Sequence, residues 1–371
     1  MSKILIISKD FLNNTVVGSK RVQYLADFLD KKNNIEPVIL TKKNNDNMKE
    51  FDYKIYTFSE KNFKLNFGKI INIYQWFVKI IKVINNETDI KLIYFSGGPF
   101  YYFIIAPIIK FLYKINYILD FRDPWYLNVD KNIIYYLQKW SIINSLYSVN
   151  VTKKLTKKYI KLYPKINKNK FITIMNGYDE RNLKKIKEKK ERSYDKIKLA
   201  IFGKFAAYRK EDVDLLIKTI NYLKQKMDIQ VFQIGNYEKY FINKVQQYNL
   251  ESNIKFLGPM NYYKGMNILS DMDCFILNNR SKNALGTKIF DYIYLNKPIL
   301  AFVDDDYLIH HFLTDFNNYY NVHNFKKLKN ALSEIHDKNL NCLDDYLEKD
   351  KYSRKEQFNK LYQYLKNILE E

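Results

Sequence analysis

The sequence predicts an α/β fold made of two tandem, doubly wound domains that face each other across a cleft. Short apolar strands alternate with helical segments along the chain, which is typical of a parallel sheet covered by helices. A charge-rich stretch at residues 181–196 interrupts this alternation, and the pattern starts again after it. Because a domain has roughly 100–200 residues, a chain of 371 residues can form two such domains, each with its own core.

The first domain is predicted from six strands and the helices between them. Val22, Leu25 and Leu29 recur at helical spacing and indicate a helix over residues 16–32. The apolar run at residues 99–119 contains an internal proline and two lysines, whereas a membrane span needs ~20 predominantly apolar residues. We therefore expect this run to be a core helix that leads into a strand. The six strands are KILIIS (3–8), PVIL (37–40), LIYFSG (92–97), NYILDF (116–121), SVNVT (148–152) and FITIMNG (171–177).

The second domain is predicted from the same alternation after residue 196. Residues 213–226 have the apolar spacing of a helix, and residues 354–371 form a final amphipathic helix. The strands are IKLAIFGKF (197–205), IQVFQIG (229–235), IKFLGPM (254–260), DCFIL (273–277) and KPILAFV (297–303). We expect Rossmann-like domains over residues 1–184 and 185–352, with a helix over 353–371 that caps the second domain or crosses back to the first.

Composition restricts the location and the partners of the protein. The formal net charge is +22, from 62 Lys and Arg against 40 Asp and Glu, which favours phosphate-bearing partners, an anionic membrane or nucleic acid. A/T-rich codons account for part of this excess, because Lys, Asn, Ile and Tyr are all abundant. Cys274 and Cys342 are too few for a disulfide framework, and MSKILIISKD lacks the pattern of a signal peptide. We therefore expect a reducing, cytoplasmic location.

Residues that directly follow strands are the candidates for a site, because ligands of open parallel sheets bind at the carboxyl ends of the strands. The acidic run at 304–306 fits a solvated loop, and His310 and His311 point about 100° apart on a helix, so we expect no metal and no cofactor. The candidates, which lie after a strand or at the start of the helix that follows it, are Gly18, Gly97, Gly98, Arg122, Asp123, Gly203, Lys204, Gly258 and Gly286.

The stretch GKFAAYRK, residues 203–210, follows a predicted strand. A glycine there lets a diphosphate approach the backbone, and the next helix offers unpaired N–H groups to an anion. Lys204, Arg209 and Lys210 add positive charge that a departing diphosphate needs. The alternative is a surface turn in a lysine-rich chain.

The stretch NALGTKIFD, residues 283–291, opens a helix with a similar combination. Gly286 is expected at the helix N-terminus, with Thr287 as its cap and Lys288 reaching a phosphate. Asp291 is placed to accept hydrogen bonds from a ribose diol. The alternative is a capped helix with an exposed lysine and an acid that favours the helix dipole.

Together these motifs resemble those of retaining glycosyltransferases of the GT-B fold, in the large family 4 that includes bacterial surface-polysaccharide transferases. The family has an acid followed by x-x-Gly, a second acid five positions later and then A-x-G-x-P-I. In this chain the matching positions are Asn283, Gly286, Asp291 and LNKPIL. Further family motifs have similar stretches in this chain. The Gly-Arg-x…Lys-Gly loop and helix resembles FGKF…RKEDVDLLIKTI, the NGxD turn resembles FITIMNGYD, and the base-contacting loop resembles IKFLGPM. YILDFRDPW resembles the D-x-R-D-x-W of the fucosaminyl-transferase-like subgroup.

The resemblance implies roles for the donor-binding residues. Lys204 occupies the place of the arginine that binds the donor diphosphate, and Arg209 or Lys210 that of its partner lysine. Asp291 takes the place of the ribose-binding glutamate. A further implied set consists of Gly203, Gly258 in the base-contacting loop, the backbone N–H groups of Gly286 and Thr287, and Lys288. Asn283 replaces the first acid, which contacts the donor sugar in relatives, so donor identity is not carried over.

The resemblance also implies a catalytic scheme. Arg122 stands where many relatives have a histidine, and all four histidines of this chain follow residue 300. Asp123 is the carboxylate nearest the expected reaction centre, and Gly18, Gly97 and Gly98 are assigned to the acceptor side. In this scheme the departing diphosphate helps to deprotonate the acceptor, while Lys204, Arg209 and Lys288 stabilise charge. The alternative is that Arg122 and Asp123 form a structural pair.

The implied activity is that of a hexosyltransferase type of enzyme that uses a UDP- or GDP-linked sugar and builds capsule, O-antigen or a similar surface polysaccharide. The implied acceptor is a glycan or a polyprenyl- or lipid-linked molecule, and no nucleic acid is expected. Lysines interleaved with aromatic residues at 61–83 fit either core packing or contact with the inner face of the membrane. Two alternatives are a sugar-nucleotide epimerase or hydrolase of the same fold, and a non-catalytic basic module that binds membrane or nucleic acid.

Overall fold

A computed structural model describes residues 1–13, 17–32, 34–43, 51–59, 68–128, 130–183, 186, 196–283, 285–337 and 348–369. Two compact units form the chain: unit 1 consists of Met1–Asn176 with Arg354–Glu371, and unit 2 of Gly177–Ser353. Several segments singled out in the sequence lie outside the described residues, namely Cys342, residues 60–67, and the linker residues 184–185 and 187–195.

Unit 1, as far as it is described, contains a seven-stranded sheet in the order β3-β2-β1-β4-β5-β6-β7. Every neighbouring pair is parallel, as the strand–helix alternation predicts. The strands are β1 (Ser2–Ile7), β2 (Ile35–Lys42), β3 (Ile55–Phe58), β4 (Ile90–Ser96), β5 (Asn116–Phe121), β6 (Tyr147–Asn150) and β7 (Phe171–Thr173).

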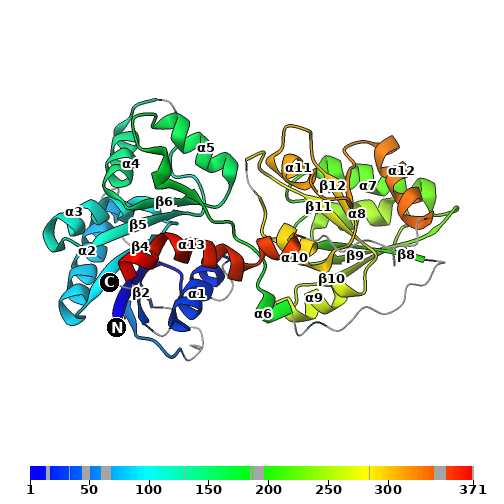
Figure 1. Ribbon diagram of the computed structural model, residues 1–371. Coiled ribbons are helices and arrows are strands. Elements are labelled where there is room, and N and C mark those ends of the chain that lie inside the picture. The colour runs from blue at the N-terminus through cyan, green and yellow to red at the C-terminus, as the bar shows by residue number, and fades with distance from the viewer. Residues whose placement is uncertain are drawn as a thin grey trace. The chain divides into compact units, whose positions relative to one another are not determined.

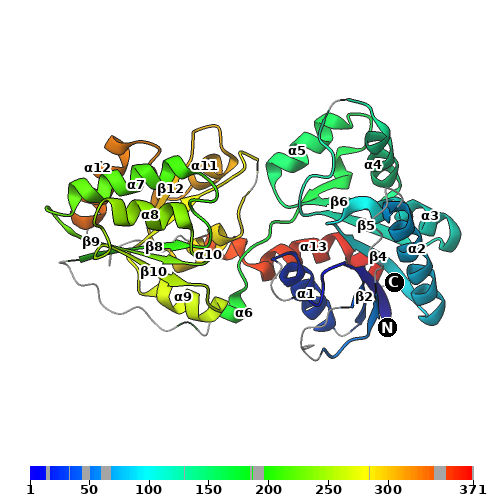
Figure 2. The same ribbon diagram turned by 180° about the vertical axis from the view of Figure 1, so that it is seen from behind.

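Helices cover both faces of this sheet (Figures 1 and 2). Because strand side chains alternate between faces, Ile4 and Ile6 of β1 pack with α1 and α13, whereas Leu5 and Ile7 pack with α2 to α5. The helices are α1 (Val17–Asp30), α2 (Gly68–Asn86), α3 (Ile105–Tyr113), preceded by the short helix η1 (Phe100–Ile104), α4 (Ile133–Asn144), α5 (Lys153–Leu162) and α13 (Arg354–Leu369).

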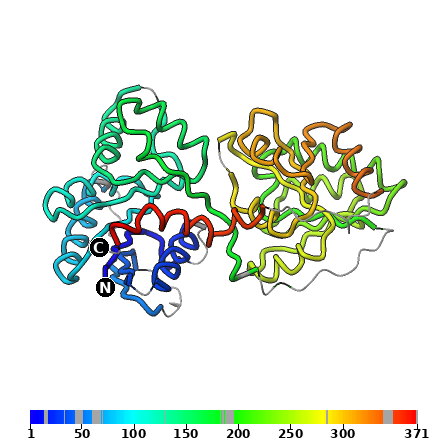
Figure 3. The backbone as a smooth tube through the Cα atoms, in the orientation of Figure 1, coloured from blue at the N-terminus to red at the C-terminus, as the bar shows by residue number. Residues whose placement is uncertain are grey.

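The last helix belongs to unit 1. Phe358, Leu361, Leu365 and Leu369 of α13 join the core formed by α1 and the strands. The chain trace shows the two ends of the sequence side by side there, α13 in red beside α1 in blue (Figure 3). The apolar face that the sequence predicts for residues 354–371 is therefore the face that packs on this sheet.

Unit 2 has the same construction on a smaller scale. Its described residues form a six-stranded parallel sheet in the order β10-β9-β8-β11-β12-β13. The strands are β8 (Lys196–Phe202), β9 (Asp228–Ile234), β10 (Ile254–Gly258), β11 (Cys274–Asn278), β12 (Ile299–Phe302) and β13 (Tyr319–Asn321). The helices are α6 (Glu180–Leu183), α7 (Lys210–Leu223), α8 (Lys239–Gln247), α9 (Tyr262–Ser270), α10 (Lys288–Leu295), α11 (Leu308–Leu313) and α12 (Phe325–Asp337).

The two-domain α/β prediction is confirmed, and the expected strands are all present with bounds shifted by a few residues. Two short edge strands, β3 and β13, have no counterpart among the predicted ones. The apolar run at 99–119 divides into η1, α3 and part of β5, as expected for a core helix before a strand. None of the helices in the described part of the chain is long and apolar enough to cross a membrane.

Candidate functional site

The strand order of unit 2 defines where a ligand of this sheet is expected. From β8 the chain continues to β9 and β10 on one side, while β11, β12 and β13 extend the sheet on the other side. In open α/β sheets, ligands bind outside the carboxyl ends of the strands where the order reverses in this way. The segments after β8 and β11 therefore frame the candidate site, and the predicted glycine turn at 203 follows β8.

Gly203 begins a turn that only glycine adopts without strain. Its φ angle is +89°, and its N–H donates to the carbonyl oxygen of Ile234 at 2.7 Å. The amide of Gln233 donates to the Gly203 carbonyl at 3.1 Å. No described heavy atom lies within 4 Å of the position that a Cβ would take at Gly203. Hydrogen bonds to β9 thus fix the turn on one side, and on the side of the missing Cβ there is open space.

Glu238 shapes the rest of this turn. Its carboxylate accepts hydrogen bonds from three consecutive backbone N–H groups, those of Phe205 at 3.0 Å, Ala206 at 2.9 Å and Ala207 at 2.7 Å. Successive N–H groups that point to one anion form a nest, and here the protein fills the nest with its own carboxylate. Sequence reasoning missed Glu238, because nothing in the sequence pairs an acid after β9 with the turn after β8.

The start of α10 lies beside this turn. The ammonium group of Lys288 is 3.5 Å from the Lys204 carbonyl oxygen and lies over the Tyr208 ring, 5.5 Å from its centre. Burial lowers the pKa of Lys288 to about 8, and the Glu238 carboxylate opposes that shift. Lys204 itself is exposed. The structure therefore brings together the turn after β8 and the first residue of α10, two segments that the sequence singled out separately.

The expected helix N-terminus is present, but its cap differs from the expectation. Thr287 stands at the N-cap position of α10, and its side chain makes no capping hydrogen bond. At Gly286, a Cβ would meet no described atom within 4 Å. The first N–H groups of a helix have no partner within the helix, so an uncapped start with open space beside it suits an anion.

Other predicted donor residues have protein partners. Arg209 pairs with Asp212 at 3.5 Å and with Asp304 at 3.3 Å, and Lys210 lies over the ring of Tyr240. These contacts give Arg209 and Lys210 a role in the packing around α7. Burial raises the pKa of Asp212 to about 6, and a hydrogen bond from Asn278 and the charge of Arg209 oppose this.

The remaining predicted residues lie on three different segments. Asp291 of α10 accepts a hydrogen bond of 2.6 Å from the hydroxyl of Tyr262 on α9. Gly258 ends β10 with φ at +73°, and a Cβ there would lie 2.8 Å from the Tyr237 hydroxyl. Asn283 is exposed, and its backbone N–H donates to Ser281 at 3.3 Å.

The acidic run at 304–306 is divided among separate partners: Asp304 contacts Arg209, Asp305 accepts from Asn321, and Asp306 pairs with Lys282. Across the part of the chain that the structure describes, no group of three or more His, Cys, Asp or Glu side chains is arranged to hold a metal ion.

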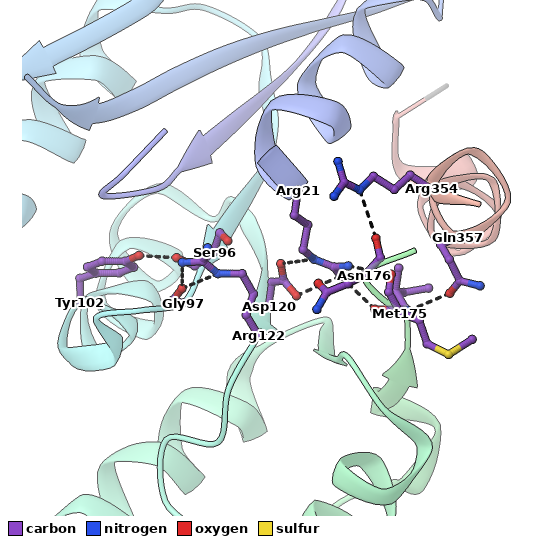
Figure 4. Close-up of polar contacts among 11 residues, drawn as sticks. Arg21, Ser96, Gly97, Tyr102, Asp120, Arg122, Met175, Asn176, Arg354 and Gln357 are labelled. Carbon is purple, nitrogen blue, oxygen red and sulfur yellow. Dashed lines mark hydrogen bonds and ion pairs between the residues drawn. The ribbon is translucent and has the colours of Figure 1, made fainter. Parts of the chain in front are cut away.

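In unit 1, the three glycines assigned to the acceptor side converge on Arg122. The Arg122 guanidinium donates from Nε to the Gly97 carbonyl at 2.7 Å and also from Nη2 (Figure 4). A Cβ at Gly18 would lie 1.4 Å from Nη1, and one at Gly98 would lie 3.3 Å from Nη2. Among the described contacts, Arg122 forms no pair with Asp123, which is exposed. The two side chains therefore do not form an ion pair with each other, because the guanidinium turns to Gly97.

A buried ion pair lies next to this cluster (Figure 4). Arg21 of α1 contacts Asp120 of β5 at 3.1 Å, and both side chains are almost fully buried. Arg21 also donates to the carbonyl oxygens of Ile174 at 3.0 Å and Met175 at 2.9 Å, which fixes the segment after β7. Burial is the largest single influence on the pKa of Arg21 and lowers it, but Asp120 and Tyr94 together outweigh burial, so the pKa is raised. Sequence reasoning missed this pair, because only the packing of α1 on the sheet brings Arg21 and Asp120 together.

The helix α13 holds the same segment from the other side. Gln357 accepts a hydrogen bond of 2.7 Å from the N–H of Met175, and the Arg354 guanidinium donates to the Asn176 carbonyl at 3.3 Å (Figure 4). The end of unit 1 before residue 177 is thus fixed by α1 and α13 together.

With this geometry in place, sequence comparison finds a family that is similar to most of unit 2. Residues 182–351 match the family Glycosyl transferases group 1. The matched region contains the Gly203 turn, Glu238 and the start of α10. No curated protein sequence matches the chain.

Solved structures show the fold of the whole chain. A glycosyltransferase from Rickettsia africae is 14% identical with a TM-score of 0.66, covering 99% of this chain and 98% of that one. A sucrose-phosphate synthase from Thermosynechococcus elongatus is 11% identical with a TM-score of 0.66, covering 100% and 96%. A UDP-GlcNAc 2-epimerase from Neisseria meningitidis bound to UDP-GlcNAc is 12% identical with a TM-score of 0.67, covering 99% and 100%. The fold is therefore GT-B, as the motifs predict.

Proposed function

We propose that this protein is a retaining glycosyltransferase that moves a hexose from a UDP- or GDP-linked donor to a glycan or lipid-linked acceptor. The observation that carries the proposal is the juxtaposition in unit 2 of the open Gly203 turn, the uncapped start of α10 and the Lys288 ammonium group. All of these lie within the region that matches Glycosyl transferases group 1. A nucleoside diphosphate is the ligand that such a combination suits, because it needs backbone N–H groups and cations at one point.

The proposal assigns each group a task on the donor. Lys204 and Lys288 neutralise the diphosphate, and the N–H groups at Gly286 and Thr287 donate to its oxygens. Asp291 accepts from the ribose diol and, since Tyr262 already donates to it, Tyr262 fixes its orientation. A UDP complex of a similar Anabaena protein and the UDP-GlcNAc complex of the Neisseria epimerase support a nucleotide-linked donor.

The reaction breaks the bond between the anomeric carbon and the phosphate oxygen and forms a bond from that carbon to an acceptor hydroxyl oxygen. The hydroxyl proton passes to the departing diphosphate, whose negative charge Lys204 and Lys288 stabilise. Arg122 and Asp123 are proposed to act on the acceptor side, with Gly18, Gly97 and Gly98 around the Arg122 guanidinium. We place the activity in surface polysaccharide biosynthesis, in the cytoplasm at the inner face of the membrane.

Nucleotide-dependent stabilisation tests the donor site. The melting temperature of the protein is measured with UDP, GDP and their sugar conjugates. We expect either the uridine or the guanosine nucleotides to raise it. The double variant Lys204→Ala/Lys288→Ala should lose this rise, whereas Lys326→Ala/Lys327→Ala, two exposed lysines of α12, should keep it. Equal stabilisation of both variants would refute the site.

A sugar-nucleotide epimerase is the second candidate, because several of the similar structures are UDP-GlcNAc 2-epimerases. Incubation with the donor alone separates the two activities. An epimerised sugar nucleotide without any acceptor would establish the epimerase, whereas product that forms only with acceptor supports transfer.

A further inference from the structure

An apolar hollow on unit 1 is not explained by the donor site. Its volume is about 420 Å³, and residues of α2, α3 and α4 line it. These three helices cover the sheet face opposite α1 and α13 (Figures 1 and 2). Aliphatic and aromatic side chains line it, among them Ile70, Tyr74, Phe77, Ile108, Leu137 and Trp140.

The hollow is surrounded by apolar side chains that face solvent. Among the residues that line it, Ile70 is 63% exposed, Tyr74 66% and Trp140 42%. Phe111, which is 74% exposed, follows the lining residue Ile108 by three positions on α3. Single exposed apolar residues are ordinary, but a contiguous group around a hollow marks an interaction surface. We call the exposed apolar residues of α2, α3 and α4, together with the hollow, the α2–α4 face.

Charge decides which partner this face suits. The segments that form α2, α3 and α4 contain lysines and not one Asp or Glu. Residues 131–178, which include α4, contain ten lysines and no acidic residue, although the whole chain contains 40 Asp and Glu residues. The ammonium group of Lys114 lies 5.1 Å from the centre of the Phe111 ring, at the exposed end of α3.

In a symmetric dimer, a second copy of the chain would place these helices, which contain lysines and no acidic residue, against themselves, and like charges oppose this. An anionic lipid surface offers the complementary charge, and its acyl chains offer an apolar medium for the exposed side chains. We propose that the α2–α4 face docks on an anionic lipid bilayer, with the hollow and its apolar rim entering the interface and the lysines at the headgroups.

This inference deepens the proposed membrane-side role by naming the surface, and it rests on that role. Its test is independent of the donor site, since lipid binding needs no nucleotide and nucleotide binding in unit 2 needs no lipid. A protein that binds UDP or GDP but no vesicles would retain the transferase proposal and lose this one.

Vesicle flotation tests the proposal. Vesicles of phosphatidylglycerol and phosphatidylcholine are compared with vesicles of phosphatidylcholine alone. We expect the wild-type protein to float with the anionic vesicles, and Tyr74→Ser/Phe111→Ser to reduce its partition about 10-fold. Both side chains are mostly exposed, so the fold should tolerate the change. The matched control is Tyr222→Ser/Tyr248→Ser, which removes two exposed aromatic rings from unit 2 and should bind as the wild type does.

Three results would overturn the proposal. They are no flotation of the wild type, equal flotation of the Tyr74→Ser/Phe111→Ser variant, and a dimer that this variant abolishes without any vesicle binding. Tryptophan emission gives a second readout, because Trp140 lines the hollow whereas Trp76 is fully buried. A blue shift on adding anionic vesicles, absent in Trp140→Phe, supports insertion, and its persistence in that variant opposes it.

Discussion

Gly18 and Gly97 of unit 1 differ from Gly203 and Gly286 of unit 2 in what surrounds them. In unit 1, a Cβ at Gly18 would overlap the Arg122 guanidinium, and one at Gly97 would lie 2.2 Å from the Phe100 ring. In unit 2, a Cβ at Gly203 or Gly286 would meet no described atom within 4 Å. Packing therefore excludes a side chain at Gly97, whereas Gly203 and Gly286 leave room for a ligand. Gly258 of unit 2 is packed like Gly97, because a Cβ there would lie 2.8 Å from the Tyr237 hydroxyl.

The cations of the two units differ in the same way. Arg21 is buried against Asp120, and Arg122 is bound to the Gly97 carbonyl. In unit 2, Lys204 is exposed, and Lys288 lies near a carbonyl oxygen and a ring. The buried Arg21–Asp120 pair holds the structure of unit 1, whereas the two lysines of unit 2 remain able to meet an anion.

Asp120→Asn should give the largest loss of stability. The substitution leaves the Arg21 charge buried without its counter-ion, which costs roughly 3–5 kcal/mol in the free energy of unfolding. Urea unfolding followed by circular dichroism measures this loss. The exposed neighbour Asp123→Asn is the control and should change the free energy by less than about 0.5 kcal/mol. Similar losses for both variants would contradict a structural role for the buried pair.

Gly97→Ala and Gly286→Ala test the contrast between the glycines directly. At Gly97 the new methyl group meets the Phe100 ring and the Asp120 carbonyl oxygen at 2.9 Å, so we expect a loss of roughly 1–3 kcal/mol. At Gly286 the methyl group enters open space, so the free energy of unfolding should change by less than about 0.5 kcal/mol.

Nucleotide binding should be affected by these two substitutions in the opposite order to stability. We expect Gly286→Ala to weaken UDP or GDP binding about 10-fold, a difference of about 1.4 kcal/mol, while Gly97→Ala leaves it unchanged. Isothermal calorimetry measures both. If Gly286→Ala binds nucleotide as the wild type does, the open space at α10 is not a phosphate site.

The strand–helix alternation was sufficient to predict the two sheets, because buried parallel strands are continuous apolar runs such as IKLAIF and NYILDF. It did not predict β3 and β13, whose three or four residues form short edges with few buried side chains. Gly203 and Lys288 were found separately by local motifs, since a glycine after a strand and a cation at a helix start are local signals.

Contacts between distant segments could not be predicted in this way. Glu238 binds a turn more than thirty residues away, and Arg21 meets Asp120 across 99 positions of sequence. Neither residue differs locally from a solvent-exposed charge on a helix or strand end. The role of the acceptor-side glycines was likewise hidden, because only the folded chain shows that the Arg122 guanidinium fills the space beside Gly18.

Glu238→Gln should give a smaller loss than either unit 1 substitution. The carboxylate now accepts from three backbone N–H groups, whereas an amide has one acceptor oxygen and leaves at least one of them poorly satisfied. We expect a loss of about 1 kcal/mol in urea unfolding and a weaker nucleotide-induced rise in melting temperature, because the Gly203 turn is held less firmly. Glu251→Gln, an exposed acid of the same unit, is the control. Equal stability of both variants would show that the nest does not depend on its carboxylate.

Lys288→Met should increase stability slightly and impair binding. Burial lowers the folded-state pKa of Lys288 from 10.5 to about 8, so the unfolded state binds more protons between these values and stability rises with pH in that window. Below pH 8 the buried charge is a cost, and the neutral methionine should remove about 1 kcal/mol of it at pH 7.

The advantage of the variant should therefore shrink as the pH is raised from 8 towards 10.5, and urea unfolding at several pH values measures this. Nucleotide affinity should fall in the variant at pH 7, and in the wild type it should fall as Lys288 loses its proton. A residue that destabilises the fold and strengthens anion binding has a role in ligand binding and not in stability. A variant that is less stable at pH 7 and binds nucleotide normally would instead make Lys288 a packing residue, and unit 2 would resemble unit 1.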